Sequence, residues 1–176
     1  MRCWTTWYAP GHDTHSVVLF EPAARVLLSA DALWERGFGV VFPELDGEQA
    51  FDAVAATFDV IEALKPAVVI PGHGAVFADP AAALAYARSR LDSFVADPAK
   101  HLRHGVKVLL KFKLLELQTM DSDALIHWAR TTPYFARIYQ EHFAEQNFPR
   151  WVDALLDDLV RAQAAARVGR LVHNVG

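Results

Sequence analysis

The sequence predicts a mixed α/β fold (α+β) in two parts: strands and helices over residues 1–97, then a helical domain over residues 98–176. Short apolar runs rich in β-branched residues are typical of strands and are concentrated in the first part. Longer segments with apolar residues every three or four positions are typical of helices and occur in both parts. The net charge of −4 is uneven, since residues 1–100 contain 7 Lys and Arg against 13 Asp and Glu, whereas residues 101–176 contain 10 against 8.

The first part opens with three expected strands. The segment WTTWYA at 4–9 leads into a loop, and the apolar runs at 17–20 and 26–28 are separated by EPAA, a turn sequence. This pattern indicates a β-hairpin whose flanking loops carry His12 and Asp31.

Two helices are expected after the hairpin. Apolar residues recur with helical spacing from Phe51 to Leu64, and Asp46 and Gln49 have the spacing of a capping box at the start of that helix. The pair Asp79-Pro80, an N-cap residue followed by proline, predicts a second helix that ends at about Val95.

A buried strand is expected between these helices. The run AVVI at 67–70 is short, apolar and bounded by prolines, and it leads into the sequence PGHG. His12, Asp31 and His73 would then each follow a strand, where packed backbone holds a side chain in place. Two imidazoles and a carboxylate suit zinc, iron or manganese, although each residue taken alone is as well explained as a turn or capping residue.

The second part is predicted to begin with an amphipathic helix after Asp97-Pro98. Its basic residues repeat every three or four positions opposite an apolar face, which predicts either a solvated surface or a contact for an anionic substrate or nucleic acid. These residues are Lys100, Arg103, His104, Lys107 and Lys111, within the basic helix Lys100–Lys113.

Three more helices are expected in the second part. Asp121 is placed to cap the first, Thr132-Pro133 to open the second, and the third is expected from Pro149 to about Arg167, with Gly169 ending it. The segment RLVHNV at 170–175 has the composition of a short strand. The acidic residues of the third helix, Asp153, Asp157 and Asp158, would repel phosphates, so we do not expect it to bind a nucleic-acid duplex.

The segments APGHDTHSVVLFEP, LLSADALW and VVIPGHG resemble, in order and spacing, the third, fourth and fifth metal-binding motifs of the metallo-β-lactamase superfamily of hydrolases. The resemblance covers about residues 3–95 and implies the C-terminal half of the αββα sandwich of that family. One branch of the superfamily carries a helical, winged-helix-like C-terminal domain, to which residues 98–176 are similar in length and layout.

The resemblance implies a role for each motif residue. His12 would ligate the first of two metals, His73 the second, and Asp31 would be the catalytic carboxylate that bridges both. A hydroxide held by the metals would attack an ester, thioester, lactone, amide or phosphodiester. Asp13 and His15 would lie beside the site or face the substrate, unless they belong only to a solvated loop.

The sequence departs from the family in one large respect. Nothing in the chain matches the His-x-His-x-Asp-His signature, which should lie well before the third motif. We therefore expect a fragment that holds metal weakly or not at all and exposes an apolar sheet face, and that is either a homo-oligomer or the partner of a missing N-terminal half.

Three functions remain open from the sequence. The first is a metal-dependent hydrolase of a small-molecule substrate, with zinc preferred and iron or manganese as alternatives. The second is a non-catalytic binding or oligomerisation module, and the third is a nucleic-acid-processing protein that uses the basic helix. Trp34, Phe38 and Phe42 follow Asp31 and would either line a pocket or pack in the core.

The compartment expected from the sequence is the cytoplasm. The single cysteine, Cys3, excludes an internal disulfide and fits a reducing compartment. No apolar run has the length needed to span a bilayer, and no charged-then-apolar leader opens the chain, so no membrane association is expected.

Overall fold

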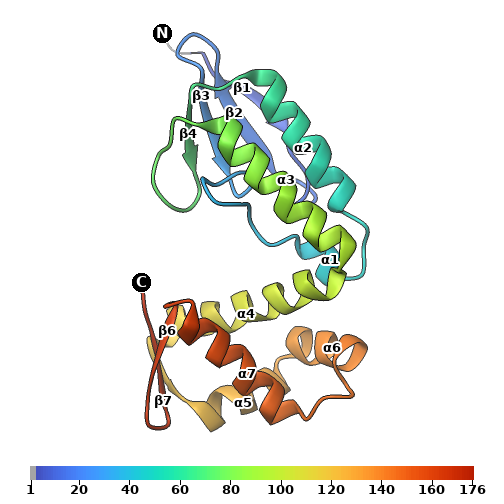
Figure 1. Ribbon diagram of the computed structural model, residues 1–176, viewed down its shortest axis with the longest axis vertical. Helices are drawn as coiled ribbons and strands as arrows, with labels where there is room; N and C mark the ends of the chain where they lie inside the picture. The colour runs from blue at the N-terminus through green and yellow to red at the C-terminus, as the bar shows by residue number, and fades with distance from the viewer. Residues whose placement is uncertain (1–2) are drawn as a thin grey trace. The chain divides into compact units, whose positions relative to one another are not determined.

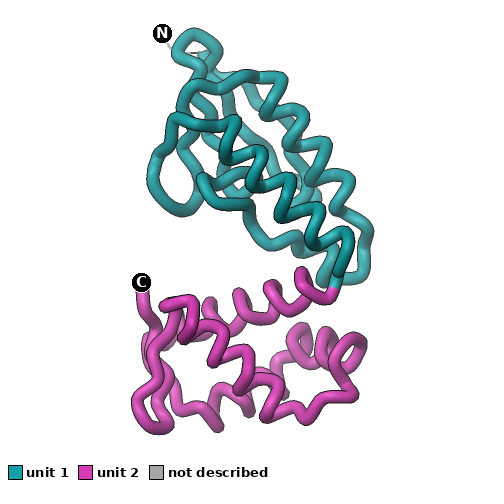
Figure 2. Tube along the Cα trace, viewed as in Figure 1, with its two compact units in different colours: residues 1–98 teal, residues 99–176 magenta. Residues whose placement is uncertain are grey.

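The computed structural model describes residues 3–176, and within them the chain forms seven helices and two sheets. The mixed α/β fold is thereby confirmed. The chain divides into two compact units, residues 1–98 and residues 99–176 (Figure 2). Each unit has its own sheet and its own helices.

The first unit is built on a four-stranded sheet in the order β1-β2-β3-β4. The hairpin expected from the EPAA turn is present, since β2 and β3 pair antiparallel, as do β1 and β2. The fourth strand pairs parallel to β3, and the chain between them forms a helical crossover. The strands are β1 (Thr5–Tyr8), β2 (Val17–Glu21), β3 (Val26–Ala30) and β4 (Val68–Pro71).

Helices cover one face of this sheet (Figure 1). They are α2 (Phe51–Leu64) and α3 (Pro80–Ala96); the short helix α1 (Phe42–Leu45) precedes α2 in the chain. Phe58 and Ile61 of α2 and Leu84 of α3 are buried in one apolar core with Leu27 and Val69 of the sheet. This core is the rigid base from which the loops at the strand ends project.

The two helix starts expected in this unit have different caps. The carboxylate of Asp79 accepts a hydrogen bond from the amide of Ala82, as an N-cap residue should. The capping box predicted for α2 is wrong, because its N-cap position is Ala50 and no cap side chain bonds there. Instead, Glu44 Oε1 accepts from the amides of Ala50 and Phe51, at 2.5 and 3.0 Å.

The sheet face turned away from the helices is apolar. Side chains alternate between the faces of a strand, so the register places Thr6, Leu19, Leu28 and Ile70 in one row across all four strands on this face. Tyr8 of the edge strand β1 lies on the same face and is 62% exposed. We call these five residues, with Val17 opposite Tyr8, the open face; the same alternation places Glu21, which is buried at the end of β2, on this side of the sheet.

The second unit combines helices with a three-stranded antiparallel sheet in the order β5-β7-β6. Its last helix is followed by a hairpin of β6 and β7, where the sequence predicts only one short strand over residues 170–175. In chain order its elements are α4 (Pro98–Leu117), β5 (Thr119–Asp121), α5 (Ser122–Thr131), α6 (Pro133–His142), α7 (Phe148–Arg161), β6 (Ala165–Val168) and β7 (Leu171–Asn174).

The last helix is shorter than its sequence predicts. We expected it to run to about Arg167, but α7 ends at Arg161, and Gln163 adopts a left-handed backbone with φ of 57°. Residues 165–168 then form β6, and Gly169 occupies the hairpin turn at φ of 59° instead of ending a helix. The alanine-rich sequence favours a helix locally, but pairing with β7 overrides that preference.

Within the described residues 3–176, no helix combines the length and the apolar character needed to cross a membrane.

Candidate functional site

Three loops at strand ends bring His12, Asp31 and His73 to one place. The loop after β1 carries His12, and Asp31 directly follows β3, whose register shifts between Leu28 and Ala30. Ala30 has a φ of 45°, so the chain turns sharply just before Asp31. The loop after β4 is tied to the same point, since the amide of Gly72 donates to the carbonyl of Ala30 at 2.8 Å.

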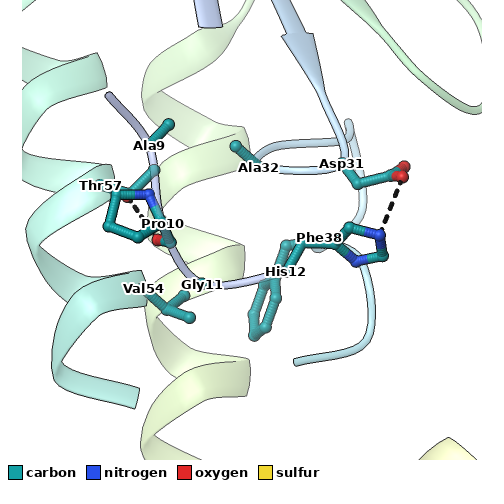
Figure 3. Close-up of a pocket in the computed structure, with 9 residues that line it drawn as sticks. All are labelled: Ala9, Pro10, Gly11, His12, Asp31, Ala32, Phe38, Val54 and Thr57. Carbon is teal, nitrogen blue, oxygen red and sulfur yellow. Dashed lines mark hydrogen bonds and ion pairs between the residues drawn. The ribbon is translucent and has the colours of Figure 1, made fainter. Parts of the chain in front are cut away.

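The carboxylate of Asp31 lies between the two imidazoles. His12 Nε2 is 3.4 Å from Asp31 Oδ2, and His73 Nε2 is 3.6 Å from Asp31 Oδ1. Figure 3 shows the side chains of His12 and Asp31 pointing toward one another. The His12 and Asp31 side chains are 24% and 28% exposed, whereas that of His73 is 72% exposed, so one side of the group is open to solvent.

A backbone carbonyl fixes the orientation of His12. His12 Nδ1 lies 2.7 Å from the carbonyl oxygen of Val40. Since a carbonyl only accepts, Nδ1 must carry the proton, and in the neutral ring Nε2 then presents a lone pair to the carboxylate. Two electron-rich atoms facing each other require a cation or a proton between them, and an imidazole held through its other nitrogen is typical of metal ligands.

The spacing of each His–Asp pair fits a shared metal, but the full set of ligands is not there. Nitrogen and oxygen ligands about 2.0–2.2 Å from one tetrahedral zinc ion are about 3.3–3.6 Å from each other. Both pairs have this separation. Within residues 3–176, however, no group of three or more His, Cys, Asp or Glu side chains is arranged to hold a metal ion. The described residues therefore supply part of a site and do not complete one.

Two glycines allow the loops to approach this closely. A Cβ on residue 39 would lie 2.6 Å from His12 Nδ1 and 2.9 Å from the Cβ of Asp31. A Cβ on Gly72 would lie 3.0 Å from Asp31 Oδ1. Neither glycine is in a left-handed conformation. Glycine is therefore needed at both positions because a side chain would not fit.

The three aromatic residues after Asp31 have different surroundings. Trp34 contacts His73 with ring centroids 5.3 Å apart, and its Nε1 donates to Asp31 Oδ1 at 3.2 Å. Phe42 packs edge-to-face against His12 at 5.2 Å. Phe38 is 3% exposed and packs against Phe58, so its main role is in the core.

Asp13 and His15 lie in the loop of His12, but the bonds of Asp13 are local. Its two carboxylate oxygens accept from the amide of His15 and from the hydroxyl of Ser16, at 2.7 and 2.9 Å. Burial raises the pKa of Asp13, but these hydrogen bonds and nearby His12 outweigh it, so that the pKa is lower than usual. Asp13 therefore remains ionised and shapes the loop, while His15 is exposed.

Two hollows of the first unit differ in size. A pocket of only about 10 Å³, roughly the space of one water molecule, lies behind His12 and Asp31 and is bordered by Phe38 and Val54 (Figure 3). A larger open hollow of about 510 Å³ is lined by residues of the turn after Trp34 and of α3, namely Glu35, Arg36, Asp79, Ala82, Ala83 and Tyr86.

Three of the basic residues considered as anion contacts bind groups within the second unit. Arg103 and Lys107 both pair with Asp158, at 2.8 and 3.4 Å. Lys111 Nζ donates to the carbonyl oxygens of Ala164 and Val175 and to the side chain of Asn174. Lys100, at the start of the helix, is exposed. The basic helix thus stabilises its own unit.

Sequence reasoning missed three features of the site. The Val40 carbonyl that orients His12 has no sequence signal, because any residue supplies a carbonyl. The sequence predicts only that Trp34 lines a pocket or packs in the core, and the bond of its indole N–H to Asp31 depends on the turn that Trp34 makes with Gly37. Gly39 had a usable signal, since a glycine between two apolar residues near a polar cluster indicates a close approach.

Part of the chain matches a known protein family. Residues 2–73 match the family model described as "Metallo-beta-lactamase superfamily". No curated protein matches the chain. Among solved structures, the chain is similar to a metallo-beta-lactamase family protein from Thermus thermophilus, with 20% identity and a TM-score of 0.40 over 98% of this chain and 50% of that chain.

A beta-lactamase domain protein from Burkholderia ambifaria is also similar, with 19% identity and a TM-score of 0.49 over 98% of this chain and 48% of that chain. The chain therefore spans about half the length of these two solved structures.

Proposed function

We propose that this chain contributes His12, Asp31 and His73 to the site of a metal-dependent hydrolase. The proposal starts from the match of residues 2–73, part of a domain, to the metallo-β-lactamase superfamily. The observation that carries the proposal is the Asp31 carboxylate, which faces an imidazole nitrogen on each of its two oxygens. A shared carboxylate between two imidazoles suits a pair of cations, because it offsets their mutual repulsion. Zinc is the metal we favour, with iron or manganese as alternatives.

Each residue has a part in this proposal. Asp31 would bridge, His12 would ligate through Nε2 while the Val40 carbonyl holds its ring, and His73 would ligate from the solvent side. When bound, the metals would supply Lewis acidity and a water nucleophile for hydrolysis. The substrate class we favour is a small ester, thioester, lactone, amide or phosphodiester.

The donors that complete the site would come from outside the described residues. The open face marks where the missing layer would pack, because a row of uncharged, largely apolar side chains is unfavourable in water. We propose that this layer belongs to the rest of the domain or to a second copy of the chain.

A single unpaired cysteine, Cys3, favours a reducing compartment, and we propose the cytoplasm.

A second candidate is a non-catalytic assembly module. It is favoured by the absence, within residues 3–176, of any group of three metal-binding side chains. A nucleic-acid function has less support, since Arg103, Lys107 and Lys111 bind groups of their own unit.

Metal content distinguishes the two candidates. We would determine zinc, iron and manganese by elemental analysis in this chain and in a form extended upstream to include a His-x-His-x-Asp-His segment. The hydrolase proposal expects two metals per extended chain, far less metal in the short form, and a loss of metal when His12→Ala is introduced into the extended form.

His15→Ala is the matched control, because His15 lies in the same loop but is exposed and does not face Asp31. Extended chains that hold no metal, with or without His12→Ala, would contradict the hydrolase proposal and favour the assembly module.

A further inference from the structure

Trp34 contacts two of the three residues of the site at once. Its indole Nε1 donates to Asp31 Oδ1 at 3.2 Å, and this is the oxygen that faces His73 Nε2 at 3.6 Å. Its ring also meets the His73 imidazole nearly at right angles, with an interplanar angle of 82° and centroids 5.3 Å apart. One side chain therefore limits both the rotation of the carboxylate and the rotation of the imidazole.

The Asp31 carboxylate and the His73 ring have few other contacts that restrict their rotation. His73 has glycines on both sides, and its side chain is 72% exposed, so its own loop restrains the ring weakly. His12 differs, because the Val40 carbonyl already holds it. Asp31 has two equivalent oxygens, and a donor bonded to Oδ1 leaves Oδ2 directed at His12.

Trp34 itself is attached to the core through its turn. The amide of Trp34 donates to the carbonyl of Gly37 at 2.8 Å. The residue before it, Leu33, is fully buried, and its carbonyl accepts from the hydroxyl of Ser29, also fully buried, at 2.6 Å. The indole thus projects from a rigid turn and can hold mobile neighbours in place.

We propose that Trp34 is a positioning residue that fixes the rotamer of Asp31 through its N–H and the orientation of His73 through its ring. The inference rests on the proposed function only for the importance of that geometry, since both contacts of Trp34 join residues of this chain. Substitution should separate the two effects. Trp34→Phe removes the N–H but keeps an aromatic ring, whereas Trp34→Leu removes both.

The test is NMR spectroscopy of the isotope-labelled, metal-free chain. We would measure solvent exchange of the five indole N–H groups, the Asp31 side-chain carboxyl ¹³C shift and the His73 ring proton shifts. We expect Asp31→Ala to accelerate solvent exchange of the Trp34 indole N–H. In the Asp31→Asn variant, which keeps an acceptor oxygen, we expect this exchange to be slower than in Asp31→Ala. Trp34→Phe should move the Asp31 carboxyl signal, and Trp34→Leu should in addition move the His73 signals toward their unstructured values.

Trp7→Phe is the matched control, because the indole of Trp7 donates to Thr5 Oγ1 and not to Asp31. It should leave the Asp31 and His73 signals in place, and backbone amide spectra verify that each variant is folded. The proposal is overturned if Trp34→Phe leaves the Asp31 carboxyl signal unchanged, or if Trp34→Leu leaves the His73 ring signals unchanged. Because no metal is present, either result is independent of whether the chain binds metal.

Discussion

Gly39 leaves no room for a methyl group beside the imidazole of His12: a Cβ on residue 39 would lie 2.6 Å from His12 Nδ1. Nδ1 is also the atom that donates to the Val40 carbonyl. We therefore expect Gly39→Ala to displace His12 and to lower the free energy of unfolding of the first unit by about 1–3 kcal/mol, the usual range for overpacking. Urea unfolding and the His12 ring signals in NMR spectra would measure both effects.

Gly47→Ala is a useful comparison for this substitution. A Cβ there would meet nothing within 4 Å, and only the left-handed backbone, with φ of 82°, disfavours alanine. We expect a loss of about 1 kcal/mol with no change at His12. If Gly39→Ala left the His12 signals in place, the close approach would have no role in orienting the ring.

The carboxylate of Glu44 takes the place of an N-cap residue for α2. It accepts hydrogen bonds from the amides of Ala50 and Phe51, which otherwise lack partners at a helix start. Glu44→Ala should lower the free energy of unfolding by about 0.5–2 kcal/mol, as the loss of a capping side chain does. The exposed Glu48→Ala is the control, and equal losses in the two variants would count against a capping role.

Asp158 should make the stability of the second unit depend on pH in the acid range. Burial raises the pKa of this carboxyl, but hydrogen bonding and charge from Arg103, with Lys107, outweigh that effect and lower it below its ordinary value of 3.8. The ionised carboxylate therefore stabilises the fold above that value, and the contribution is lost as the pH falls through the lower, folded-state pKa.

Asp158→Asn should remove this contribution at neutral pH, about 1.5–3 kcal/mol for hydrogen bonds to charged groups, and should make stability fall less steeply in acid. Urea unfolding followed by tryptophan fluorescence between about pH 2 and 7 would measure it. Asp157→Asn is the comparison, since Asp157 is half exposed and pairs with Arg167 at 3.4 Å. Identical pH profiles for Asp158→Asn and the unmodified chain would show that the lowered pKa has no effect on stability.

The open face should make the isolated chain self-associate. Leu28 stands at its centre, opposite Leu19 on one side and Ile70 on the other. Leu28→Lys places a charge there and should shift the chain to a monomer, as determined by light scattering after size-exclusion chromatography. Val95→Lys on the exposed surface of α3 is the control and should leave the association state unchanged. A monomeric unmodified chain would contradict the expectation.

The sequence predicts those features of the structure whose hydrogen bonds join residues close together in the chain. The caps at Asp79 and Asp121 were predicted because an N-cap residue bonds amides two or three positions ahead. The cap by Glu44 was not predicted, because Glu44 contacts the start of α2 across a loop. Strand β6 was not predicted, because its strand conformation depends on pairing with β7.

In the candidate site, the three side chains could be predicted from the sequence, but the groups that orient them could not. His12, Asp31 and His73 were chosen as residues after strands, and the structure brings them together. The atoms that orient them could not be predicted from spacing, because the Val40 carbonyl and the Trp34 indole contact them through tertiary turns.

The parallel pairing of β3 with β4 has a kinetic consequence. His12 and Asp31 flank a hairpin, which forms within microseconds from neighbouring segments. His73 joins them only after α2 has folded and β4 has docked, which closes a loop of roughly 40 residues. The group should therefore assemble in two stages during folding, and a metal ion added early would meet His12 and Asp31 before His73 arrives.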